Sequence, residues 1–60
     1  MFKIRLIRHY NHDTTVNIIM PEEHESLFKA CDRADLYKGK NPQANYLVFD
    51  DETGDIHYEV

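Results

Sequence analysis

The chain has 60 residues, of which 42% are hydrophobic and 30% are charged, and its formal net charge is −4 at neutral pH. This composition excludes a disordered tail, and the acidic balance argues against direct binding to a nucleic-acid backbone. The single cysteine, Cys31, excludes an internal disulfide, so a domain with so small a core would need a partner, a second copy or a metal for added stability.

No targeting or membrane segment is predicted. The first ten residues lack the apolar core of a signal peptide, and no later stretch approaches the roughly twenty apolar residues of a membrane span. The free thiol of Cys31 agrees with a reducing compartment. We therefore expect a cytoplasmic protein that does not contact membranes.

The N-terminal third predicts a β-hairpin. Residues 2–6 (F-K-I-R-L) and 14–20 (T-T-V-N-I-I-M) follow the period of two that is typical of half-buried strands. An odd number of loop residues keeps both apolar sets on one face, and this predicts a three-residue loop at 11–13. The inward-facing residues are then Phe2, Ile4, Leu6, Val16, Ile18 and Met20.

The stretch H-Y-N-H-D at residues 9–13 has two interpretations. His9 and His12 are three positions apart, so on a continuous strand they would point to opposite faces, and zinc would need at least one further ligand. Asn and Asp are common in tight turns. We therefore interpret the stretch as a polar hairpin tip and expect no metal, with a metal-dependent hydrolase using His9, His12 and Asp13 as the alternative.

One helix is predicted between Pro21 and Gly39. Proline suits a first helical position, the three glutamates within 22–25 complement the positive end of the helix dipole, and glycine commonly ends a helix. Helical spacing predicts an apolar stripe formed by Leu27, Phe28, Cys31 and Ala34, with Ala30 and Tyr37 at its margin.

No residue set predicts catalysis. Cys31 and Ser26 both fall within the predicted helix, where a cysteine is usually a small buried hydrophobe and a serine lacks the elbow of serine hydrolases. Gly39 and Gly54 are the only glycines, too few for a phosphate-binding loop. Adjacent carboxylates would need a cleft, which so short a chain can hardly build. We expect a protein that is not an enzyme and has no cofactor.

The last fifteen residues predict a second hairpin around an acidic turn that contains glycine. We place its loop at Asp51 to Gly54. One face then holds Leu47, Phe49, Ile56, Tyr58 and Val60, and the opposite face holds Tyr46, Val48, His57 and Glu59. A three-residue loop would reverse this assignment, and the segment Tyr46 to Phe49 is apolar on both sides in either case.

These elements predict a single domain over residues 1–60 with an α+β fold of the ββαββ type. The helix returns the chain so that the third strand runs antiparallel to the first. Only the spatial order 2-1-3-4 makes every neighbouring pair of strands antiparallel. We expect a four-stranded antiparallel sheet in this order, with one helix packed on one face.

The sheet face opposite the helix is the predicted binding surface. The first strand carries Ile7 on its outward side. If the loop of the second hairpin has four residues, the third strand also presents Tyr46 and Val48 on this face. An apolar centre within a charged rim is the usual anatomy of a protein interface. The expected partner-binding residues are Ile7, Ile19, Tyr46, Val48, Arg5, His9 and His57.

We expect a small protein-binding module that acts as an inhibitor or adaptor, with another protein or a second copy of the chain as its partner. In length and layout the chain resembles the small inhibitors and accessory proteins encoded by phages and other mobile elements. The resemblance is one of size and architecture, and it implies a role in docking on a larger protein.

Two alternative functions follow from other residue groups. An oligomer could bind a nucleotide-like ligand between its copies through Tyr46, Tyr58, Arg5, Arg8 and His9. The acidic turn could instead imitate nucleic-acid phosphates through Asp50, Asp51, Glu52 and Asp55, although a charge run is usually a solvated surface.

Overall fold

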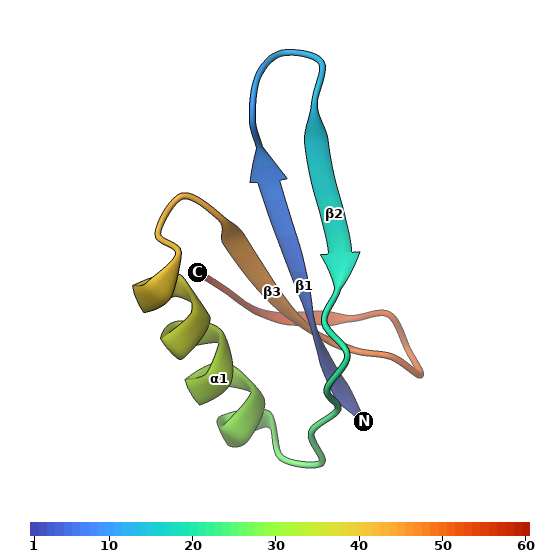
Figure 1. The fold of residues 1–60 in the computed structure, drawn as a ribbon. Helices are drawn as coiled ribbons and strands as arrows, with labels where there is room; N and C mark the ends of the chain where they lie inside the picture. The colour runs from blue at the N-terminus through green and yellow to red at the C-terminus, as the bar shows by residue number, and fades with distance from the viewer.

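A computed structural model describes all 60 residues and has the predicted order of elements. One antiparallel sheet, in the order β2-β1-β3-β4, is formed by β1 (Phe2–His9), β2 (Thr15–Ile19), β3 (Asn45–Asp50) and β4 (Ile56–Glu59). The helix α1 (Leu27–Lys40) packs against β1 and β3 on one side of the sheet (Figure 1). The predicted ββαββ α+β fold and strand order are confirmed.

The N-terminal hairpin closes as predicted, with a loop of three residues at 11–13. The backbone N–H of Tyr10 donates to the carbonyl of Thr14 at 2.9 Å and ends the ladder. Asn11 Oδ1 then accepts from the backbone N–H groups of Asp13 and Thr14 at 2.9 and 2.8 Å. Such a bond from an asparagine side chain to the backbone two residues ahead stabilises a tight turn. The tip of the hairpin projects beyond the helix (Figure 1).

The predicted helix start at Pro21 is wrong, because α1 begins at Leu27 with Ser26 as its N-cap. The preceding segment instead continues along the edge of β1. The N–H of Phe2 donates to the carbonyl of His24 at 2.7 Å, and the N–H of His24 donates back to Phe2 at 2.9 Å. This pairing satisfies backbone groups that would otherwise lie exposed at the edge of β1. The three glutamates within 22–25 therefore lie before the helix and not in its first turn.

The helix also continues past the predicted stop at Gly39 and ends at Lys40. Asn41 caps it, and the N–H of Asn41 donates to the carbonyl of Tyr37 at 2.8 Å. Gly39 has no positive φ angle, so it fills an ordinary helical position and does not act as a left-handed terminator.

The helix packs on the sheet through Ala30 and Ala34, which are both fully buried. The prediction that Phe28 belongs to the buried stripe is wrong, since its side chain is 85% exposed. Phe28 lies two positions from Ala30 and so projects from nearly the opposite side of the helix. Small side chains at the contact bring the helix close to Ile4 and Val48, the two largest fully buried side chains. Partly buried residues around this contact include Leu27, Cys31 and Tyr37.

The second hairpin has the predicted four-residue loop, 51–54. Asp50 and Asp55 close it, with a 2.9 Å hydrogen bond from the N–H of Asp50 to the carbonyl of Asp55. Gly54 adopts a φ of 81°, a left-handed conformation that residues with a side chain rarely adopt.

A β-bulge in β4 changes the register beyond this loop. Phe49 pairs with Ile56, but the next residue of β3, Val48, pairs with Tyr58. His57 is therefore an extra residue without a direct partner on β3. Because of this insertion, Ile56 and Tyr58 lie on opposite faces of the sheet, although they are two positions apart.

Pairing with β1 decides which face of β3 enters the core. Val48 lies opposite Ile4, and Tyr46 lies opposite Leu6. Tyr46 and Val48 are consequently buried beneath α1, and the predicted face assignment for β3 is wrong. The six buried residues are Ile4, Ala30, Ala34, Ala44, Tyr46 and Val48.

Candidate protein-binding face

The sheet face opposite α1, here termed the outer face, is defined by the strand register. On β1 it holds the residues of odd number, which alternate with the core residues of even number. Their cross-strand neighbours share the same face. The outer face comprises Lys3, Arg5, Ile7, His9, Thr15, Asn17, Ile19, Asn45, Leu47, Phe49, Ile56 and Glu59.

An apolar band crosses the outer face. Ile7, Leu47 and Phe49 are half-buried at its centre, and Ile19 and Ile56 are exposed at its two ends, on the edge strands. The helix packs on the other side of the sheet, so no element of the chain covers this band (Figure 1). The face is therefore available for contact with another molecule.

Arg5 organises the polar groups beside the band. Its guanidinium carbon lies 5.3 Å from the centroid of the Phe49 ring, and its Nη1 donates to Asn17 Oδ1 at 2.8 Å. Lys3 Nζ lies 3.3 Å from Glu23 and 3.5 Å from Asp51. The pKa of the Lys3 ammonium is raised mainly by the hydrogen bond to Glu23. The Lys3 ammonium thus stays charged beside an apolar surface, as in the rim of an interface.

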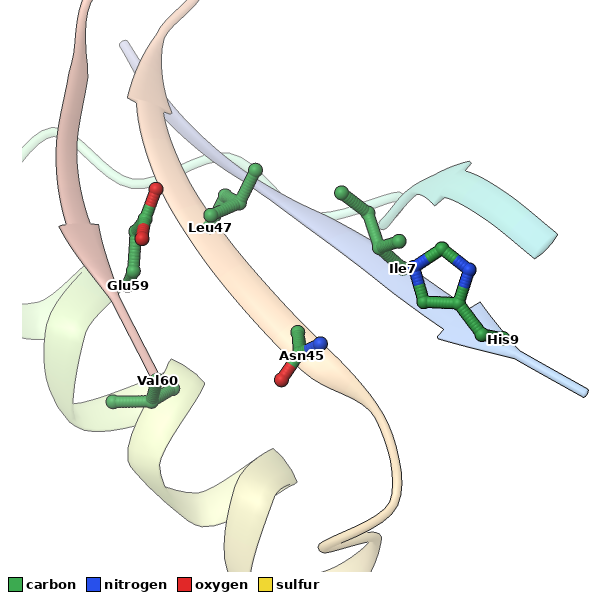
Figure 2. A pocket seen from close by; sticks show the side chains of 6 residues that line it. All are labelled: Ile7, His9, Asn45, Leu47, Glu59 and Val60. Carbon is green, nitrogen blue, oxygen red and sulfur yellow. The ribbon is translucent and has the colours of Figure 1, made fainter. Parts of the chain in front are cut away.

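A shallow groove of about 540 Å³ lies at one end of the outer face. Figure 2 shows its lining, with Ile7 and Leu47 on adjacent strands and His9 and Glu59 on its two sides. Asn45 and the C-terminal Val60 complete it. The groove combines apolar walls with one imidazole, one amide and one carboxylate, and it is open to solvent along its length.

The structure places four of the seven predicted binding residues on the outer face, namely Arg5, Ile7, His9 and Ile19. The other three lie elsewhere. Tyr46 and Val48 are buried in the core, and the ring of His57 packs edge-on against Phe2, with 5.6 Å between the ring centroids. Leu47 and Phe49 take the central positions instead. No sequence signal marks these two, because β3 is apolar on both sides.

The residues of the alternative ligand site do not come together. Tyr46 is in the core, and the hydroxyl of Tyr58 donates to Asp35 Oδ1 at 2.6 Å on the helix side. Arg8 also faces the helix side of the sheet, where its guanidinium carbon lies 4.5 Å from the centroid of the Tyr10 ring. Arg5 and His9 lie on the outer face. Within one copy of the chain, the five residues of this alternative site are therefore divided between the core and the two faces of the sheet.

The acidic turn is partly engaged within the chain. Asp51 lies 3.4 Å from the N-terminal amine and 3.5 Å from Lys3 Nζ, while Asp50 Oδ1 accepts from the backbone N–H of Glu52 at 2.9 Å. Glu52 and Asp55 are exposed, and neither forms an ion pair. Of the four carboxylates, Asp50 thus accepts a hydrogen bond within the turn and Asp51 pairs with neighbouring cations.

His9 is the last residue of β1, whereas His12 and Asp13 lie in the loop at 11–13. His9 Nδ1 lies 2.9 Å from Thr15 Oγ1 across the strand pair. No group of three or more His, Cys, Asp or Glu side chains in the chain is arranged to hold a metal ion. The tip is thus organised by bonds between turn residues and across the hairpin.

A polar cluster links the segment before α1 to the helix. Glu22 accepts a 2.7 Å hydrogen bond from the hydroxyl of Tyr37 and lies 3.6 Å from Arg33 Nε and 3.4 Å from His24 Nε2. Burial disfavours the charged carboxylate, but Tyr37, His24 and Arg33 outweigh it, so the pKa of Glu22 is lowered. Neither hollow of the surface reaches this cluster. The cluster joins the segment before α1 to the helix, and its scattered members give no sequence motif.

Cys31 lies beside Leu27 and Phe28 in an apolar hollow of about 200 Å³ on the flank of the helix. Burial, and then the charges of Asp35 and Asp32, raise the pKa of the thiol. A raised pKa keeps the thiol protonated and poorly nucleophilic at neutral pH.

No protein-family model, curated protein or solved structure matches the chain. The helix α1 lacks the length and apolar character needed to cross a membrane.

Proposed function

We propose that the chain is a non-enzymatic protein-binding module that docks on its partner through the outer face. The observation that carries this proposal is the uncovered apolar band, with Ile7, Leu47 and Phe49 at its centre and charged or amide side chains around it. Complete burial of a large aliphatic side chain contributes about 1.5 to 3 kcal/mol, and a half-buried one gains roughly half of that in a complex, before association costs.

The small core supports the same proposal. Only six of the 60 residues are buried, and the thinnest dimension of the molecule is 18 Å, which is the thickness of one helix packed on one sheet. A partner on the outer face would add a third layer and enclose β1 and β3 on both sides. A compact inhibitor or adaptor of a cytoplasmic protein, of the kind that phages and other mobile elements encode, is a role that this architecture can fill.

Electrostatic mimicry by the acidic turn is the second candidate. Glu52 and Asp55 are exposed beside the partly neutralised Asp51, so the turn could present carboxylates to a basic site. Binding through the turn would weaken steeply with salt, whereas binding through the apolar band would weaken little. Salt dependence of binding therefore separates the two candidates.

The proposal is tested by affinity capture from the source cell. The test variant carries Ile7→Thr and Leu47→Thr, which remove apolar surface and keep a residue that strands tolerate. The control variant, Leu36→Gln, removes an exposed leucine from the far side of the helix. Proteins captured by the wild type and the control, lost with the test variant, and bound again by purified wild-type chain in calorimetry would support docking through the outer face.

The opposite pattern would refute it. Recovery of the same proteins at the same yield by the double variant, with its fold verified by amide chemical shifts, means that the partner binds elsewhere. A parallel capture with Glu52→Gln and Asp55→Asn tests the acidic turn. Loss of the partner with this second pair alone would favour mimicry.

A further inference from the structure

The two edges of the sheet differ in how they are protected. β2 has the sequence T-V-N-I-I and contains no charged residue, proline or bulge. Edge strands of natural proteins usually carry such features, because a bare edge pairs with strands of other chains. β4 has them, with a bulge at His57 and a carboxylate at Glu59. Only the β2 edge is open to a further strand.

The backbone of β2 presents hydrogen-bonding groups to this open edge. The bonds from Met20 N to the carbonyl of Ile4 and from Tyr10 N to the carbonyl of Thr14 show which pairs of the β1–β2 ladder exchange hydrogen bonds. They are the pairs in which the β2 residue has an even number. The N–H and C=O groups of Thr15, Asn17 and Ile19 therefore point away from β1.

The side chains of β2 are also uncovered on both faces. Ile18, on the helix side, is 51% exposed, and Ile19, on the outer face, is 46% exposed. α1 packs against β1 and β3 and does not reach the far end of the hairpin (Figure 1). A strand with free backbone groups and exposed isoleucines on both faces is suited to pairing with another strand.

We propose that a second copy of this chain occupies the edge, with the two β2 strands antiparallel about a two-fold axis at Asn17. Asn17 then faces Asn17 of the second copy, and Thr15 and Ile19 face each other across the interface. Each of these three facing pairs exchanges two backbone hydrogen bonds. On the helix side, Val16 of each copy packs against Ile18 of the other, which gives a continuous apolar strip.

Two features favour a second copy over a foreign strand. The chain carries a net charge of −4, but β2 is uncharged, so two copies can pair there without bringing like charges into direct contact. The pairing is also self-complementary, because the apolar positions flank Asn17 symmetrically. With one open edge on each chain, the assembly closes at two copies and does not extend into a fibre.

The dimer would form one eight-stranded sheet in which the two outer faces are continuous.

This inference does not depend on the proposed function, because it uses a different surface and a different observable. The test variant is Ile18→Lys, which lies on the helix side and leaves the outer face unchanged. The control is Leu36→Lys, at a helix position of similar exposure, 54%.

Sedimentation equilibrium of the purified chain over a wide concentration range gives the mass. We expect a monomer–dimer equilibrium for the wild type and for Leu36→Lys, with association at least about tenfold weaker for Ile18→Lys, because an inward-pointing charge on an edge strand opposes pairing. In amide exchange by NMR, protection of Thr15, Asn17 and Ile19 should rise with concentration in the wild type.

A wild type that remains monomeric at all concentrations overturns the inference, as does a dimer that Ile18→Lys leaves intact. A dimer that protects the amides of Ile56 to Glu59 in place of the β2 amides overturns it as well. Should Ile18→Lys fail to fold, the concentration dependence of amide exchange in the wild type decides the question without a variant.

Discussion

Ile4 of β1 and Val48 of β3 lie opposite each other, and both are fully buried beneath α1. Because so few other large side chains are fully buried, this pair carries much of the apolar burial in the core. We expect Ile4→Ala to lower the free energy of unfolding by about 2 to 5 kcal/mol, the usual range for such a truncation in a core. A domain this small has little more stability than that, so the variant should be largely unfolded in urea titrations monitored by circular dichroism.

Ile18→Ala is the matched control, because it makes the same change at a half-exposed position of β2. In the monomer, at low protein concentration, Ile18→Ala should lower the free energy of unfolding by about 1 kcal/mol or less, since its side chain loses little burial. Equal destabilisation by the two variants would show that the core does not lie between α1 and the Ile4 side of β1.

The alternation of side chains in β1 made the sheet predictable. Lys3 and Arg5 mark one face of this strand and Ile4 marks the other, so its core side can be read from the sequence alone. The odd loop of the first hairpin then determines the face of β2. The strand order follows from the direction in which each strand and the helix runs. These directions do not depend on any single side chain.

The face of β3 could not be predicted in the same way. Its segment Y-L-V-F contains no polar residue to mark a solvent side, so its orientation depends on the register with its neighbours. The extra residue His57 shifts that register within β4, and no glycine or proline marks this bulge. Contact between Val48 and Ile4, 44 positions earlier in the sequence, decides the outcome. The centre of the candidate binding face therefore had to be read from the structure.

The start of α1 was also determined by a long-range contact. Local signals at Pro21 and the following glutamates are compatible with a helix, but His24 pairs with Phe2 and keeps this segment extended. The helix therefore begins only after Ser26, its N-cap, whose Oγ accepts from the backbone N–H of Lys29 at 3.4 Å.

Ser26→Ala should lower the free energy of unfolding by about 0.5 to 1 kcal/mol, because the first turn of α1 loses its cap. Ser26→Asp should preserve stability, since aspartate also caps and suits the positive end of the helix dipole. Pro21→Ala should change stability by less than about 0.5 kcal/mol, as at other exposed positions. Thermal unfolding of the three variants measures these effects. Unchanged stability of Ser26→Ala would contradict the assignment of Ser26 as the N-cap of α1.

Glu22→Gln should make the stability of the protein less sensitive to acid. The pKa of Glu22 is lowered in the folded chain from an ordinary value of 4.5, so its charged form favours folding. This contribution is fully present above pH 4.5 and is lost as the pH falls through the lower folded pKa. At neutral pH we expect Glu22→Gln to cost about 1 to 2 kcal/mol through the weakened bond with Tyr37.

The measurement is urea denaturation of wild type and variant at a series of pH values. The difference in the free energy of unfolding between wild type and Glu22→Gln should become smaller as the solution becomes more acidic than pH 4.5. Glu25→Gln is the control, because Glu25 is exposed and forms no ion pair in the structure. A constant difference at every pH, or an equal effect of the control, would contradict the role assigned to the Glu22 carboxylate.

The two glycines should respond with opposite signs to substitution by alanine. Gly54→Ala is expected to destabilise by about 1 to 2 kcal/mol, because its φ of 81° is unfavourable for a residue with a Cβ. Gly39→Ala should stabilise by about 0.5 to 1 kcal/mol, because Gly39 lies in the last turn of α1. An added Cβ meets no atom within 4 Å at either position, so steric contact does not explain the difference. Thermal unfolding of both variants measures the change in stability. A change of the melting temperature in the same direction for both would contradict either the left-handed conformation of Gly54 or the helical conformation of Gly39.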